Sequence, residues 1–134
     1  MQPRAGSERI VNVHTDVFWV SDGVLGIHIK GPCSIDTKDT DEIFAAFDRL
    51  GVVGPTPLLA DIRTLRGVSL GVRTHMSSER AGRYLSRVAL VADSPLTRTI
   101  GNFFMRLNRP PFPVRVCNGG DEAMRWLMAP SEPP

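Results

Sequence analysis

Apolar and polar residues alternate along two segments near the N-terminus, at 9–14 and 24–30, and the segment between them at 17–20 is wholly apolar. Alternation with a period of two is typical of β-strands that cover a core with one face. The polar turn Ser21-Asp22-Gly23 separates the segment at 17–20 from that at 24–30. We therefore expect the chain to begin with an antiparallel meander of two or three strands.

The stretch from 88 to 117 predicts a strand, a helix and a second strand. Val88–Ala92 is a continuous apolar run, as in a strand that is covered on both faces. Ser94 and Pro95 suit the N-cap and the first position of a helix. The inward residues predicted for that helix recur at helical spacing: Leu96, Ile100, Phe103, Phe104 and Leu107. Residues 113–117 form the second strand, and a long crossover between parallel strands makes a βαβ unit.

Three further helices and one strand complete the pattern. The first helix follows Ser34–Asp36, and its apolar face consists of Ile43, Phe44, Phe47 and Leu50. Residues 58–62 form a second buried strand, 71–84 a weaker helix and 121–127 a last helix. Alternating strands and helices predict an α/β sandwich with a mixed, mainly parallel sheet that is covered by helices.

The chain is long enough for one globular domain, with 134 residues of which 42% are hydrophobic and 22% charged. We assign 1–8 to a flexible N-terminus, 9–128 to a single α/β domain and 129–134 to a disordered tail. No signal-peptide pattern opens the chain, and no apolar run approaches the roughly 20 residues that span a bilayer. We expect a cytoplasmic protein with no membrane span, whose two cysteines, Cys33 and Cys117, are reduced.

Charge is unevenly spread along the chain although the net charge is only +2. Residues 62–115 contain ten arginines and two acidic residues, a net charge of +8. Such a basic half can attract phosphate or an acidic partner, or it can simply reflect solvated helix faces. No strand carries the mixture of aromatic and basic residues typical of RNA binding, so we expect no nucleic-acid partner.

With its elements in this order, the chain resembles the SpoIIAA-like, or STAS-type, domains best known from anti-sigma-factor antagonists. It is similar above all to an actinobacterial branch of small STAS/SEC14-like proteins of unassigned function. The resemblance spans roughly 9–127 and is carried by LLADIR (58–63), VALVADSPLTRTIGNFFMRLNRPPFPVRV (88–116) and DEAMRWL (121–127). It implies a SpoIIAA-like fold, with N-terminal antiparallel strands followed by a βαβαβα arrangement, and it implies no particular activity.

The resemblance also points to Ser69 as a phosphate acceptor. Antagonist domains are regulated by phosphorylation of a serine in a D-S-x-G turn, eight residues after an aspartate that ends a strand. Here Ser69 follows Asp61 by eight residues and Gly71 keeps the S-x-G spacing, but Val68 replaces the acidic residue. The alternative is that Ser69 only caps the following helix, although a helix start also tolerates a phosphate well.

A second candidate site follows from the rule that ligands bind beyond the C-terminal ends of parallel strands. The rule gathers six candidate residues on one rim, together with Asn118: Asp61, Arg63, Asp93, Ser94, Thr97 and Arg98. The helix start within this set is either an anion site or a plain cap beside a solvated arginine. Asp61 and Asp93 could form a carboxylate pair, although strand-end aspartates more often bond loop amides.

Nothing in the chain matches a catalytic or metal-binding pattern. No nucleophile–base pair is visible, and the three histidines have no metal-ligand spacing. We therefore expect a protein that is not an enzyme, with no catalytic residue, no cofactor and no metal. The connector NRPPFP (108–113) either offers an exposed Phe112 to a partner or packs that ring on the sheet.

Two functions from different classes remain open. The first is a non-enzymatic regulatory or protein-interaction domain, which we expect to be a homodimer with a protein partner and to act as a phosphorylation-dependent switch. The second is a binder of a small apolar or lipid-like ligand beneath the amphipathic helices. A cavity-free two-fold interface would favour the first, and an apolar pocket lined by Phe103, Phe104 or Trp126 would favour the second.

Overall fold

The structure, a computed structural model, describes residues 1–107 and 111–130. Its elements in chain order are β1 (Arg9–Val11), β2 (Thr15–Ser21), β3 (Val24–Ile29), β4 (Cys33–Ile35), α1 (Thr37–Arg49), β5 (Thr56–Asp61), β6 (Leu65–Val68), α2 (Leu70–Met76), α3 (Glu79–Tyr84), β7 (Leu85–Val91), α4 (Pro95–Leu107), β8 (Val114–Cys117) and α5 (Gly120–Met128). Most of the predicted tail (131–134) and half of the predicted connector (108–110) lie outside the described residues.

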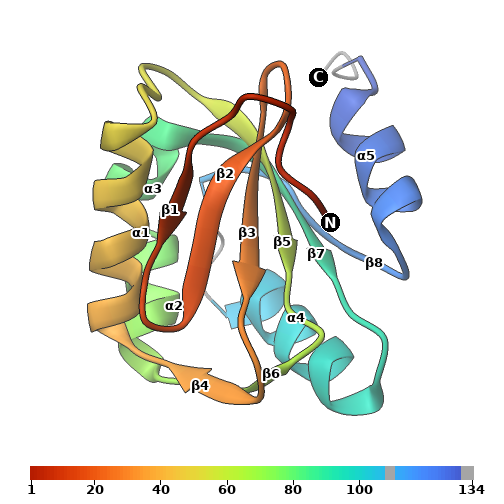
Figure 1. Ribbon diagram of the computed structural model, residues 1–134. Helices are drawn as coiled ribbons and strands as arrows, with labels where there is room; N and C mark the ends of the chain where they lie inside the picture. The colour runs from red at the N-terminus through yellow and green to blue at the C-terminus, as the bar shows by residue number, and fades with distance from the viewer. Residues whose placement is uncertain (108–110, 131–134) are drawn as a thin grey trace.

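Six strands form the main sheet, in the order β1-β2-β3-β5-β7-β8 (Figure 1). Strands β1, β2 and β3 are antiparallel neighbours, which agrees with the predicted meander. Strands β3, β5, β7 and β8 are parallel neighbours, and α4 provides the crossover of the predicted βαβ unit. A small second sheet pairs β4 with β6 in parallel. The sequence analysis missed it because strands of three and four residues are too short to show a period.

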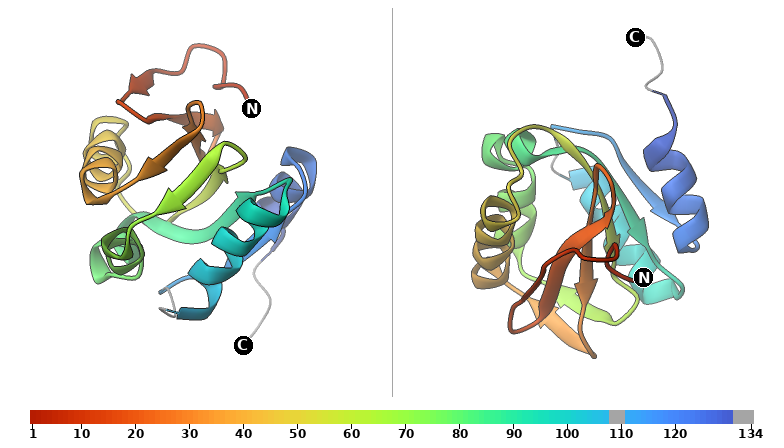
Figure 2. Two further views of the ribbon diagram at one scale, coloured as in Figure 1. Left: turned by 90° about the horizontal axis from the view of Figure 1, so that it is seen from below. Right: turned by 45° about the horizontal axis from the view of Figure 1, so that its top comes forward.

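Helices α1 to α4 cover one face of the main sheet, and α5 covers the other (Figure 2). The pleat of β5 divides its residues between these faces. Leu58 and Ala60 join the large core under α1 to α4, whereas Leu59 packs in the smaller cluster under α5. Every second residue of a strand points to the same side, so the continuous apolar runs of β5 and β7 serve two cores. The predicted α/β sandwich is confirmed.

The helix predicted over 71–84 is two helices. Ser77 ends α2, and Ser78 begins α3 because its hydroxyl accepts a hydrogen bond from the backbone N–H of Ala81 at 3.3 Å. A serine hydroxyl competes for backbone donors, which favours helix ends over helix interiors. Strand β7 then starts at Leu85, three residues earlier than predicted.

The prediction for the inward face of α4 was partly wrong. Leu96 and Phe103 are each 42% exposed. The helix instead turns Thr97, Ile100, Gly101 and Phe104 toward the sheet, where Thr97 and Ile100 are buried. Gly101 explains this rotation: a Cβ built there would lie 2.7 Å from Cγ2 of Val116, so the missing side chain lets α4 approach β8 closely.

Phe112 is buried in the large core. The prediction that it could be an exposed docking residue is therefore wrong, and the alternative that its ring packs on the sheet is correct. None of the helices in the described parts of the chain is long and apolar enough to cross a membrane.

Candidate functional site

The C-terminal ends of the parallel strands form one rim, as predicted. Asp61 ends β5 and lies opposite Val91 of β7, which in turn lies opposite Cys117 of β8. Asp93 follows β7 by two residues, and Asn118 comes directly after β8. Polar residues that are far apart in the chain therefore meet at one edge of the sheet.

Asp61 and Arg63 form a tight pair at this rim. The Asp61 Oδ1 atom accepts hydrogen bonds from Nε of Arg63 at 2.9 Å and from its backbone N–H at 3.2 Å. Oδ2 accepts from Nη2 of Arg63 at 2.7 Å. Burial raises the pKa of Asp61, but the hydrogen bonds and charge of Arg63, together with the nearby His28, outweigh it and lower the pKa. Asp61 is thus an ionised carboxylate, and both of its oxygen atoms already accept hydrogen bonds from Arg63.

Two further residues, which the sequence analysis did not select, extend this pair into a row across the sheet. His28 lies opposite both Asp16 on β2 and Asp61 on β5. Its Nδ1 atom is 3.7 Å from Oδ2 of Asp61, and Asp16 is 3.3 Å from Nζ of Lys30. The alternation of β2 and β3 could have suggested that Asp16 and His28 share a face. Their register with β5 could not be read from the sequence.

The helix start at Ser94 is engaged in capping. The hydroxyl of Ser94 accepts from the backbone N–H of Thr97 at 3.2 Å, and Oγ1 of Thr97 accepts from the backbone N–H groups of Asp93 and Ser94, both at 3.2 Å. Arg98 donates to Oδ1 of Asn118. These contacts match the plain-cap alternative, because the capping hydroxyls already have partners.

A groove of about 280 Å³ lies beside the rim on the α5 side of the sheet. Asp61 and Arg63 line it together with Asp121 at the start of α5. Met124 and the apolar side chains of β5 and β7 form much of its remaining wall. Of the six predicted rim residues, the structure brings two, Asp61 and Arg63, into this groove.

Ser69 is not among the residues that line this groove, and it lies at the N-cap of α2. It is exposed, its side chain makes no capping hydrogen bond, and its backbone N–H donates to the carbonyl of Ile35 at 3.1 Å. Leu70 beside it is 67% exposed. Packing explains the glycine at position 71 of the S-x-G motif, because a Cβ there would lie 2.4 Å from Cγ2 of Thr37 at the start of α1.

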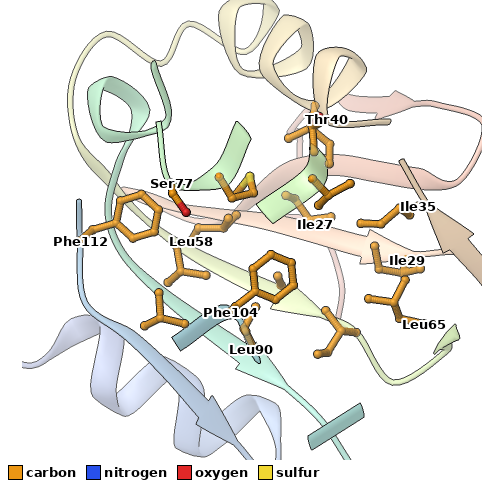
Figure 3. A pocket seen from close by; sticks show the side chains of 17 residues that line it. Ile27, Ile29, Ile35, Thr40, Leu58, Leu65, Ser77, Leu90, Phe104 and Phe112 are labelled. Atoms are coloured by element: carbon orange, nitrogen blue, oxygen red, sulfur yellow. The ribbon is translucent and has the colours of Figure 1, made fainter. Parts of the chain in front are cut away.

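An apolar cavity of about 70 Å³ lies between the sheet and helices α1, α2 and α4 (Figure 3). Fifteen of its seventeen lining residues are apolar, including Phe104 and Phe112, and the other two are Thr40 and Ser77. Phe103 and Trp126, the other two predicted lining residues, are not part of it. The periodicity of the strands predicted a core here, but a gap in side-chain packing leaves no trace in a sequence pattern.

Cys33, Cys117 and Thr40 carry nucleophilic groups within or beside the core. Burial raises the pKa of both Cys33 and Cys117, so their thiols stay protonated at neutral pH. Oγ1 of Thr40 donates to the carbonyl of Thr37 at 2.9 Å and lies 2.7 Å from Nδ1 of His75. Within residues 1–107 and 111–130, no cluster of three or more histidine, cysteine or acidic residues could hold a metal ion.

Fold and strand order together define a SpoIIAA-like α/β domain. The structure is similar to the crystal structure of an uncharacterised DUF3478-family protein with a SpoIIAA-like fold from Shewanella loihica PV-4. That match has a TM-score of 0.56 and 16% sequence identity, and it covers 95% of this chain and 98% of the other. The chain belongs to the family described as Domain of unknown function (DUF7793), whose model matches residues 18–130. A comparison with curated proteins finds no match.

Proposed function

We propose that this chain is a non-enzymatic interaction domain that binds a protein partner through the surface at the start of α2, and that phosphorylation of Ser69 regulates this contact. The observation that carries the proposal is the combination of an exposed serine, whose hydroxyl caps nothing, with the strongly exposed Leu70 next to it. An exposed large apolar residue beside a modifiable hydroxyl suits a contact that a charge can weaken.

Ser94 offers an instructive contrast to Ser69. Its hydroxyl lies 2.9 Å from Oγ1 of Thr97 and also caps α4, so modification there would break the helix start. Phosphorylation of Ser69 would break no such side-chain bond in the described structure. It would add about −1.5 to −2 charges to a surface within the basic half of the chain.

The test is native mass spectrometry of the protein purified from its own host, as wild type, Ser69→Ala and Ser94→Ala. We expect a homodimer in which some copies carry a phosphate-sized increment that is lost in Ser69→Ala and kept in Ser94→Ala. A bare polypeptide mass, or an increment that persists in Ser69→Ala, would contradict the switch. A monomer would contradict the homodimer without affecting the phosphate assignment.

The apolar cavity favours a second function, in which the domain binds a small apolar ligand between the sheet and helices α1, α2 and α4. A void lined almost wholly by apolar side chains favours an apolar guest over water, because water needs two to four polar partners. Denaturing the purified protein and analysing the released small molecules by mass spectrometry tests this function separately from phosphorylation.

A further inference from the structure

Arg73 on α2 carries buried guanidinium nitrogens that have no hydrogen-bond partner. Neither Nε nor Nη1 of Arg73 finds an acceptor among the described residues. The guanidinium carbon lies 3.8 Å from the centroid of the Phe103 ring on α4, so the guanidinium makes a cation–π contact with that ring. Buried donors without acceptors are energetically costly, and an acceptor that reaches Arg73 would therefore be held strongly.

The contact between Arg73 and Phe103 lies next to the apolar cavity. Val72, which precedes Arg73, and Met76, one helical turn later, both line the cavity from α2. Phe104, which follows Phe103, lines it from α4 (Figure 3). The arginine and the exposed ring thus join the two helices that close the cavity.

The two hydroxyl groups that line the cavity already donate hydrogen bonds to backbone carbonyls. The Thr40 hydroxyl donates to the carbonyl of Thr37, and the Ser77 hydroxyl donates to the carbonyl of Arg73 at 2.7 Å. The hydroxyl protons of both polar lining residues are therefore used in hydrogen bonds to the helix backbone. A ligand that enters must place an apolar part inside and keep any charged part at the edge, beside Arg73.

We propose that the cavity binds an anionic amphiphile, with its apolar chain among the core side chains and its carboxylate or phosphate on the guanidinium of Arg73. This inference rests on the second function proposed above. Arginine matches both headgroups because its planar fork donates two parallel hydrogen bonds. The net charge of +8 over residues 62–115, which include α2 and α4, also attracts an anion to this side of the molecule.

The volume of the cavity sets the length of chain that can enter. At about 70 Å³ it has roughly half the volume of the apolar cavity of about 150 Å³ that binds benzene. A chain of a few carbons therefore fits while the helices keep their places. A longer chain requires α4 to move away from the sheet, and the part of α4 at Gly101 is held closely against Val116.

The experiment measures binding of three six-carbon probes, hexanoate, hexyl phosphate and hexanol, whose last few carbons fit the cavity while the carbons next to the headgroup lie at its edge beside Arg73. Methyl NMR of the isoleucine, leucine and valine side chains reports whether a probe enters the cavity and gives its affinity. We expect at least one anion to bind about tenfold more tightly than hexanol, the scale of charge-assisted hydrogen bonds. In Arg73→Met this preference should disappear while hexanol binding stays the same.

Two variants serve as controls. Arg80→Met removes another stacked arginine, whose guanidinium carbon lies 4.7 Å from the Phe44 ring, and it should leave all three affinities unchanged. Ala60→Val adds volume at a lining residue in a strand, where β-branched side chains are well tolerated, and it should weaken all three probes together. Thermal unfolding of each variant verifies that it is folded.

The results test the apolar ligand site and the role of Arg73 separately. Tighter binding of hexanoate than of hexyl phosphate would assign the headgroup to a carboxylate, and the reverse to a phosphate. Equal binding of anions and hexanol, unchanged in Arg73→Met, would overturn the role of Arg73 while the apolar ligand site stands. Absence of methyl shifts with every probe would overturn the ligand site, and this inference with it.

Discussion

The two faces of the main sheet are built from the same strands but have opposite chemistry. The face under α1 to α4 is apolar from β2 to β8 and contains the cavity. The opposite face has an apolar cluster under α5 and also buries Phe18, and beside them it carries the row Asp16, His28 and Asp61. Four helices cover the first face, whereas on the second face α5 covers one part and a row of polar and charged side chains occupies another.

This difference predicts that the two faces stabilise the fold in different ways. On the apolar face, stability comes from burial, which depends little on pH and strongly on side-chain volume. On the polar face, stability comes from ionised pairs that respond to pH. Three substitutions test this division, and they are given in order of decreasing expected effect.

The largest effect is expected for Phe47→Ala. Phe47 is fully buried on α1, with its ring centroid 5.4 Å from that of Tyr84 and 6.3 Å from that of Phe44. Removing the ring should lower the free energy of unfolding by about 3–5 kcal/mol in urea titrations. Leu127→Ala, in the smaller cluster under α5, should cost about 2–3 kcal/mol. A larger loss in Leu127→Ala would contradict the view that the helix-rich face is the main core.

Asp61→Asn should have an intermediate effect that depends on pH. The pKa of Asp61 is lower in the folded than in the unfolded chain, so its charge stabilises the fold above the unfolded pKa of about 3.9. This contribution is lost as the pH falls through the folded pKa. Urea titrations should give a loss of about 1.5–3 kcal/mol at pH 7, shrinking below about pH 4.

The exposed Asp93 provides a control for this pH dependence. Asp93→Asn should leave the free energy of unfolding nearly unchanged both at pH 7 and below about pH 4, because an exposed charge is well screened by solvent. If Asp61→Asn had the same effect at every pH, its contribution would come from shape and hydrogen bonding instead of charge.

The smallest of the three effects is expected for Gly101→Ala. The added methyl group would meet Cγ2 of Val116 at 2.7 Å, and the β-branched valine has little freedom to move away. Overpacking should outweigh the better helix propensity of alanine and lower the unfolding free energy by about 1–2 kcal/mol, measured by thermal unfolding. Gly120→Ala on α5, where nothing lies within 4 Å, should be neutral; equal losses would mean that α4 is no closer to the sheet than α5.

Much of the fold could be predicted because long periodic segments carry their structure locally. The apolar runs of β5 and β7 and the spacing of Ile43, Phe44 and Phe47 on α1 gave the correct elements. The inward face of α4 was missed because the glycine at 101 decides it. A glycine carries no signal in a hydrophobicity pattern, yet a Cβ at position 101 would lie 2.7 Å from Val116 on β8.

The candidate site was less predictable because its parts meet only through strand pairing. The position of Asp61 at a strand end could be read from the sequence, as could its neighbour Arg63. The register that sets His28 between Asp16 and Asp61 depends on bulges and turns elsewhere in the sheet. The partner of Arg73 is a ring on a helix some thirty residues later, and no local pattern links the two.

The strand order of the main sheet follows the order of the chain: each strand lies beside the next sheet strand to leave the ribosome. No strand must wait for a later one to be inserted between its neighbours, so the sheet can grow from one edge as synthesis proceeds. Residues up to β5 can assemble while the remainder is still being made, and β8 with α5 completes the other edge. The domain can therefore assemble in the order of synthesis, and α5, which covers the second face of the sheet, packs last.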